Sequence, residues 1–120
     1  MISKELLSEV LNDYTITNVG KKPDNNDMLY YVFITSNGQY TDNDVEYINV
    51  YSLAHKCKEW AYMRGYEIYT SPYSVELSLV NKTKMNGKRC LYRDTADVNS
   101  FSITSKHIFK ACQWILDNKE

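Results

Sequence analysis

The chain has 120 residues, which is the size of one domain. Hydrophobic residues make up 43% of it and charged residues 24%, with 4 glycines and 2 prolines, so its composition excludes a disordered or collagen-like chain. The formal net charge of −1 excludes binding to nucleic acid or to acidic membranes through net charge alone.

The N-terminal part is predicted to be a short helix followed by strands. Ser3 is suited to cap a helix over residues 3–11, in which leucines and a valine recur on one side. Apolar and polar residues alternate weakly over residues 14–19, which predicts a strand. Residues 20–27 contain Pro, Asn and Asp and are predicted to form an exposed loop. In residues 28–35 (MLYYVFIT), both the odd-numbered and the even-numbered positions are mostly apolar or aromatic. This pattern predicts a central strand that is covered on both faces.

The Asn37-Gly38 dipeptide is typical of a hairpin turn. After it, the segment DNDVE at residues 42–46 has alternating acids, but it lacks the glycine and the distant glutamate of a calcium loop. We therefore interpret these residues as a solvated acidic turn.

The clearest helix in the sequence begins after Asn49, a suitable N-cap, and ends at Gly65. One side of this helix is apolar at the helical period: Val50, Leu53, Ala54, Cys57, Trp60 and Ala61. A strand over 66–69 is predicted next, broken by Ser71-Pro72, and then an alternating strand over 75–79.

The C-terminal part is predicted to contain a hairpin and a closing helix. Asn86-Gly87 is a turn signal that leads into a strand over 88–93, and residues 104–118 have the apolar period of a helix. Because short turns join the later strands, they must form an antiparallel meander.

These elements predict an α+β fold with a largely antiparallel sheet, two amphipathic helices on one face of it and a short N-terminal helix. We expect one domain over residues 1–120, in which 1–47 hold the first helix and strands and 48–118 form a helix-strand-strand-strand-helix unit. The sequence does not decide whether the first helix joins the other two helices or covers the opposite face of the sheet. The strand over residues 28–35, which is apolar on both faces, favours the opposite face.

The expected compartment follows from what the sequence lacks. Residues 1–20 show no basic region followed by an apolar run, and no stretch is apolar enough to cross a membrane, so we expect a cytoplasmic protein without membrane association. Cys57, Cys90 and Cys112 have neither disulfide-framework nor zinc-site spacing, so we interpret them as reduced thiols.

Two segments resemble a known group of proteins: INVYSLAHKCKEWAYMRGYEI at residues 48–68 and HIFKACQWILDNK at 107–119. They resemble the ends of small phage and prophage proteins of unknown function, of the phage alpha-beta-alpha sandwich type. The resemblance covers about residues 48–118. It implies a fold and a phage origin, and no catalytic residue is carried over with it.

Residues for catalysis are few. The only histidines are His55 and His107, and no local signature joins either of them to Cys90 as a nucleophile and base. The chain has no glycine-rich phosphate loop and no zinc-protease motif. We therefore expect a protein that is not an enzyme and that uses no cofactor or metal.

Tyrosine accounts for 11 of the 120 residues, which directs attention to binding surfaces, where this residue is enriched. Tyr51, His55, Lys58 and Tyr62 follow one another at helical spacing beside the apolar side of the second helix. These rings can simply line the edge of the core. The alternative is a protein-binding surface made of these four residues.

The second candidate surface is basic. Residues 81–93 contain five basic and no acidic residues, whereas residues 1–50 contain eight acidic and three basic ones. The basic patch consists of Lys82, Lys84, Lys88, Arg89, Tyr92 and Arg93. It can be a solvated turn, it can bind phosphates and stack a base, or it can dock on an acidic protein surface.

We therefore expect a small phage-type accessory protein that binds an unidentified protein partner, for which a host defence component is one candidate. The alternative function is nucleic-acid binding through the basic hairpin at residues 82–93.

Overall fold

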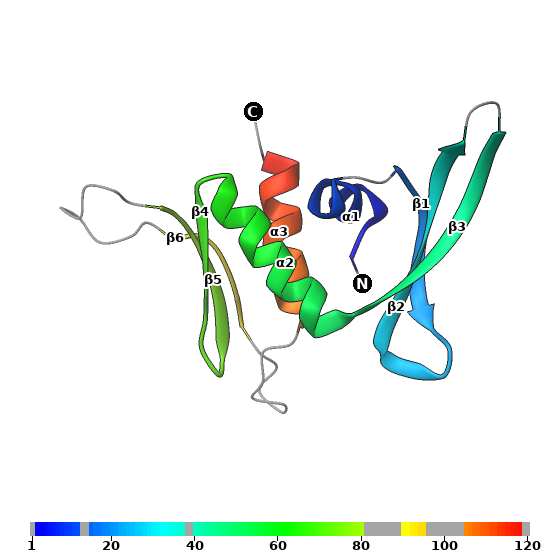
Figure 1. Ribbon diagram of the computed structural model, residues 1–120. Helices are drawn as coiled ribbons and strands as arrows, with labels where there is room; N and C mark the ends of the chain where they lie inside the picture. Colours follow the sequence, from blue (N-terminus) through cyan, green and yellow to red (C-terminus); the bar gives the residue numbers. More distant parts are fainter. Residues whose placement is uncertain (1, 13–14, 38–39, 81–89, 96–104, 119–120) are drawn as a thin grey trace. The chain divides into compact units, whose positions relative to one another are not determined.

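The computed structural model describes residues 2–12, 15–37, 40–80, 90–95 and 105–118. Figure 1 shows the order of the elements in these residues. They are α1 (Lys4–Leu11), β1 (Thr15–Lys22), β2 (Asn25–Asn37), β3 (Tyr40–Asn49), α2 (Val50–Met63), β4 (Tyr66–Thr70), β5 (Ser74–Leu79), β6 (Cys90–Thr95) and α3 (Ser105–Asn118).

The α+β class and the antiparallel pairing are confirmed, but the strands lie in two sheets. The described strands form one sheet in the order β1-β2-β3 and another in the order β4-β5-β6. The prediction of one sheet is therefore wrong. Strands joined by tight turns pair with their neighbours, whereas the 14-residue helix α2 lies between β3 and β4 and supplies no turn that would pair them.

The chain divides into two compact units, Met1–Leu53 and Ala54–Glu120. The boundary falls inside α2, a few residues after the predicted division between residues 47 and 48. That both parts form one domain, and that α2 and α3 cover one face of a sheet, stay predictions.

The first unit begins with α1, which is capped as predicted. The Ser3 side chain accepts a hydrogen bond from the backbone N–H of Leu6 at 3.1 Å. Leu6 and Leu7 are fully buried, and α1 contacts β1. A short helix of this length depends on such packing, because its own hydrogen bonds do not stabilise it in water.

The predicted loop over residues 20–27 is wrong. β1 continues to Lys22 and β2 starts at Asn25, and these two residues pair, so only Pro23 and Asp24 form the turn. Polar residues at the end of a hairpin keep their backbone hydrogen bonds in the ladder while their side chains reach water. Pairing therefore overrides the loop-like composition.

The strand β2 is central, as predicted, but its two faces differ. Leu29, Tyr31 and Phe33 are buried, whereas Ile34 on the other face is exposed. Because successive side chains point to opposite faces, one face of this sheet is buried and the other open. The prediction that both faces are covered is wrong.

The predicted acidic turn over residues 42–46 is also wrong, because these residues belong to β3. Asn37 pairs with Tyr40, which confirms the hairpin, and the register continues to the pair of Met28 with Asn49. Gly38 and the side chain of Asp42 lie outside the described residues. The Asp44 carboxylate is exposed and accepts a hydrogen bond from the Thr35 hydroxyl at 3.0 Å, so it is solvated on a strand.

The helix α2 has the cap, the buried side and the end that the sequence predicts. Asn49 Oδ1 accepts hydrogen bonds from the backbone N–H groups of Tyr51 at 2.8 Å and Ser52 at 3.4 Å. All the predicted apolar positions after Val50 are buried. Gly65 follows the helix with a φ of +90°, the left-handed conformation that glycine adopts without steric cost.

The second unit contains the predicted meander and the closing helix. β5 pairs with β4 and with β6, both antiparallel, and α3 contacts β5 and β6. The hairpin tip at Asn86-Gly87 lies outside the described residues. The buried side chains of α3 are Phe109, Ala111, Cys112 and Ile115.

Two buried thiols join α2 to α3. Cys57 and Cys112 are free cysteines, as predicted, and the Cys112 thiol donates to the backbone carbonyl oxygen of Cys57 at 3.5 Å. Hydrogen bonding to the Cys112 side chain, followed by burial, raises the pKa of the Cys57 thiol far above its usual range. Cys57 therefore stays protonated in the folded protein.

Removing the cap of α2 should destabilise the protein. Asn49→Ala leaves the N–H groups of Tyr51 and Ser52 without their acceptor, and we expect the free energy of unfolding to fall by about 1 kcal/mol. Urea titration followed by circular dichroism measures this loss. Asn49→Asp keeps an acceptor and serves as the control, so an equal loss in both variants contradicts the capping role.

Stability should also fall at alkaline pH. The unfolded state loses the Cys57 proton above the ordinary thiol pKa of about 8.5, whereas the folded state keeps it. The stabilisation is therefore present below that pH and declines above it, by about 1.4 kcal/mol per pH unit. Urea titrations between pH 8 and 10 should show a steeper decline for the native sequence than for Cys57→Ala, and equal slopes contradict this origin.

Candidate functional site

Three of the four residues predicted to form a binding surface line one groove. His55, Lys58 and Tyr62 lie on the same side of α2 and face this groove. Tyr51, the fourth, belongs to the first unit and does not line it. Its hydroxyl donates to the Asp27 carboxylate at 3.5 Å. The structure therefore brings the last three residues together and leaves Tyr51 apart.

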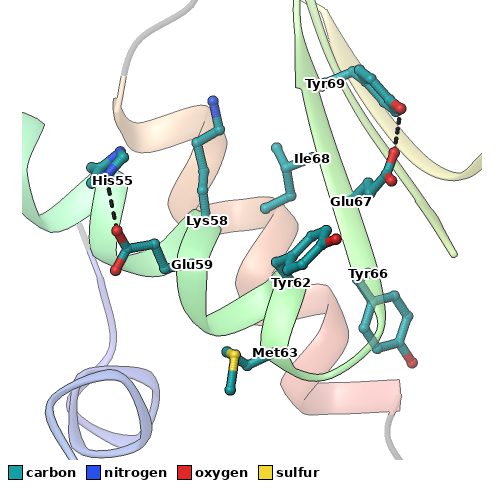
Figure 2. Close-up of a pocket in the computed structure, with 9 residues that line it drawn as sticks. All are labelled: His55, Lys58, Glu59, Tyr62, Met63, Tyr66, Glu67, Ile68 and Tyr69. Carbon is teal, nitrogen blue, oxygen red and sulfur yellow. Dashed lines mark hydrogen bonds and ion pairs between the residues drawn. The ribbon is translucent and has the colours of Figure 1, made fainter. Parts of the chain in front are cut away.

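The groove lies between α2 and β4 and has a volume of about 650 Å³. Figure 2 shows side chains of the helix and of the strand on either side of it. The helical wall consists of His55, Lys58, Glu59, Tyr62 and Met63, and the strand wall of Tyr66, Glu67, Ile68 and Tyr69.

The groove exists because the chain reverses tightly after α2. The backbone N–H groups of Arg64 and Gly65 donate to the carbonyl oxygens of Ala61 and Tyr62, each at 3.0 Å. These bonds close the last turn of the helix, and the left-handed Gly65 then directs the chain into β4. Helix and strand thereby become the two walls of one open space.

The apolar part of the groove is well exposed. Tyr62 is 60% and Met63 84% exposed, and Tyr69 is also exposed. Ile68 is half-buried and points into the groove between the two walls. Exposed tyrosine and methionine side chains around a hollow are typical of surfaces that bind other molecules, because they bury large areas on contact.

The polar part of the groove is mostly paired within itself. His55 Nε2 lies 2.9 Å from Glu59 Oε1, one helical turn away, and the Tyr69 hydroxyl donates to the Glu67 carboxylate. Arg64, next to the groove, stacks its guanidinium over the Trp60 ring at 4.8 Å. For Lys58, in contrast, no ion pair is found within the described residues, so its ammonium is the one groove cation that a ligand can reach.

The site offers binding groups rather than an activated nucleophile. Cys57 lies on α2 but is fully buried and holds its proton, and a thiol is a weak nucleophile in that form. Within the described part of the chain, no group of three or more His, Cys, Asp and Glu side chains could hold a metal ion.

The structure does not define a contact between the Cys90 thiol and either histidine. The side chain of Cys90 lies outside what the structure describes. His55 pairs with Glu59, and His107 Nε2 lies 4.0 Å from the Asp94 carboxylate, with both side chains largely buried.

The basic patch is described only at its C-terminal end. Lys82, Lys84, Lys88 and Arg89 lie outside the described residues. Arg93 Nε is 3.4 Å from Glu76 Oε1 on the neighbouring strand. The Tyr92 ring lies 6.4 Å from the Trp114 ring on α3, and burial followed by the nearby Asp94 charge raises its pKa. These two residues are thus engaged within their own unit.

A second exposed apolar surface lies on the open face of the first sheet. It contains Ile34, Val45 and Tyr47, and the Lys22 ammonium lies 5.3 Å from the centre of the Tyr47 ring. Lys22 also lies 3.5 Å from Asp24. Unlike the groove between α2 and β4, this surface is formed by the strands of a single sheet.

The strand wall of the groove is what sequence reasoning missed. Residues 66–69 are predicted to be a strand and Gly65 a helix end, but neither prediction by itself places the strand beside the tyrosines of α2. The signal was present in the short Arg64-Gly65 connection, because so short a turn must place the start of the strand beside the end of the helix.

Comparisons of the chain with family models, with curated proteins and with solved structures found no match. None of the helices in the described ranges is both long and apolar enough to cross a bilayer.

Substitutions in the groove should leave the fold intact. The side chains of His55 and Glu59 are 73% and 65% exposed, and Tyr62 is exposed to a similar degree. We expect Glu59→Gln and Tyr62→Ser to change the free energy of unfolding by no more than about 0.5 kcal/mol. Urea titration checks this, with the buried Leu53→Ala as a contrast that should lose about 2–5 kcal/mol. A loss above 2 kcal/mol in the exposed variants would show that the groove side chains support the fold.

Proposed function

We propose that this chain is a non-enzymatic protein that acts by binding a protein partner in the groove between α2 and β4. The observation that carries the proposal is the groove itself, in which exposed Tyr62 and Met63 flank a hollow beside the Lys58 ammonium. Its size and open form suit protruding side chains of another protein. Tyrosine and methionine contribute large contact areas, and a nearby charge adds specificity.

The resemblance of residues 48–118 to small phage and prophage proteins supplies a biological context for the proposal. In that context the chain is a phage-encoded accessory protein of the cytoplasm. A component of a host defence system is then one partner to look for. The groove supports this reading by offering contacts without an activated catalytic group in the site.

Nucleic-acid binding through residues 82–93 is the competing function, and the described members of the basic patch do not favour it. Arg93 is paired with Glu76, and Tyr92 packs toward Trp114. Both are thereby less available to phosphates or bases.

A pull-down with matched variants tests the proposal. The tagged chain is incubated with host-cell lysate, half of it treated with nuclease, and bound proteins are identified by mass spectrometry. We expect a stoichiometric partner that survives nuclease and is lost with Tyr62→Ser, since removing a central aromatic weakens an interface by about 2 kcal/mol, or roughly 30-fold.

The control is Tyr73→Ser, because Tyr73 is 60% exposed, as Tyr62 is, but lies outside the groove. It should retain the partner. A partner that both variants bind equally well, or recovery of nucleic acid without protein, would contradict the proposal. The second result would instead favour the basic patch.

A further inference from the structure

The strand β4 is an edge of its sheet. The described strands of the second unit have the order β4-β5-β6, so β4 pairs with β5 on one side and with no described strand on the other. Edge strands present backbone N–H and C=O groups to which a further strand can bind.

The register shows which backbone groups of β4 face outward. Tyr66 pairs with Leu79, Ile68 with Leu77 and Thr70 with Val75. The bonds that flank this ladder join Val80 N–H to the Gly65 carbonyl, and Ser71 N–H to the Ser74 carbonyl, each at 2.8 Å.

In an antiparallel pair, hydrogen-bonded and non-hydrogen-bonded positions alternate. Gly65 and Ser71 are bonded positions, so Glu67 and Tyr69 are bonded to β5 as well. The backbone groups of Tyr66, Ile68 and Thr70 therefore point away from β5, toward the open edge.

This open edge borders the groove. Side chains of a strand point alternately to its two faces, so a hollow over one face would be lined by every second residue. The groove is lined by four consecutive residues, Tyr66 to Tyr69, and thus runs along the edge of β4. The helix α2 forms the opposite wall, so a segment bound in the groove would lie between the helix and the open edge of β4.

We propose that the partner binds as an extended segment that adds a strand to β4, with an acidic side chain of that segment paired to Lys58. This inference rests on the proposed function and names its partner chemistry. Strand addition at a sheet edge beside a helix supplies affinity through backbone hydrogen bonds and specificity through pockets for alternate side chains.

The dimensions and charges of the groove define the segment. Five strand residues extend about 17 Å, and Tyr66, Ile68 and Thr70 each offer one N–H and one C=O to the added strand. On the helical wall, Tyr62 and Met63 fit apolar side chains. The two carboxylates of the groove, Glu59 and Glu67, are engaged by His55 and by the Tyr69 hydroxyl. The Lys58 ammonium has no ion pair with any described residue, so it is the group that selects a carboxylate.

Amide exchange of the free protein, measured by NMR, tests the edge directly. The N–H groups of Tyr66, Ile68 and Thr70 should exchange faster than those of Glu67 and Tyr69, which are bonded to β5. Equal protection at all five positions would overturn the inference, because the edge would then already be occupied.

Binding of synthetic peptides tests the partner chemistry. The probes are fluorescent eight-residue peptides with blocked ends that alternate valine with glutamate, compared with peptides that have lysine in place of glutamate. Fluorescence polarisation should show the glutamate peptides binding at least tenfold more tightly, and Lys58→Glu should reverse this order. No binding of either set at millimolar concentration, or tighter binding of the lysine peptides to the native chain, would overturn the inference.

A proline substitution separates backbone pairing from side-chain contact. The N–H of Ile68 points outward, so Ile68→Pro removes a donor to the added strand without removing a bond to β5. We expect this variant to bind the glutamate peptides about tenfold more weakly than Ile68→Ala, which shortens the side chain but keeps the N–H. The retained protection of the Glu67 and Tyr69 amides shows that the sheet is intact.

The same variants separate this inference from the proposed function. If the captured partner is lost with Tyr62→Ser but binds Ile68→Pro and Ile68→Ala equally, the groove binds protein and strand addition is wrong. If Tyr62→Ser retains the partner, both proposals fail. A concentration-dependent dimer of the chain alone, abolished by Ile68→Pro but not by Ile68→Ala, would show that the edge pairs with a second copy instead.

Discussion

The groove depends on the conformation of one residue, Gly65. Its φ of +90° allows the chain to leave α2 and enter β4 within two residues, without the steric cost that a side chain would add. The carbonyls of Ala61 and Tyr62 accept the N–H groups of Arg64 and Gly65, so the reversal is tied to the last turn of the helix. A longer connection would separate the helix from the strand and remove one wall of the groove.

Burial of the neighbouring side of α2 fixes which of its residues face the groove. Leu53, Cys57 and Ala61 are fully buried, and the protonated Cys57 shares a hydrogen-bonded contact with Cys112 of α3. With that side of the helix committed to packing, the polar and aromatic side chains a third of a turn away are exposed. One side of the helix thus stabilises the fold and another side faces the groove, so residues on the groove side can be changed without loss of packing.

The open edge of β4 gives the groove backbone hydrogen-bond donors and acceptors, which its side chains alone would not supply in a regular row. Outward N–H and C=O groups recur at every second residue, whatever the sequence of the strand. Tyr62 and Met63 add apolar contact area, and Lys58 adds charge selection. Backbone pairing and side-chain selection together distinguish this site from the open face of the first sheet, where Val45 and Tyr47 are exposed on the face of a single sheet.

The sequence by itself determined the local elements: the caps Ser3 and Asn49, the buried side and the glycine end of α2, and the hairpin at Asn37. These features depend on neighbouring residues and on the helical period, which a sequence displays directly. Only the tertiary structure decided that the strands form two sheets, that DNDVE lies on a strand, and that β4 is the second wall of the groove. Strand pairing depends on partners far along the chain, and a backbone satisfied by a ladder tolerates polar residues that otherwise indicate a loop.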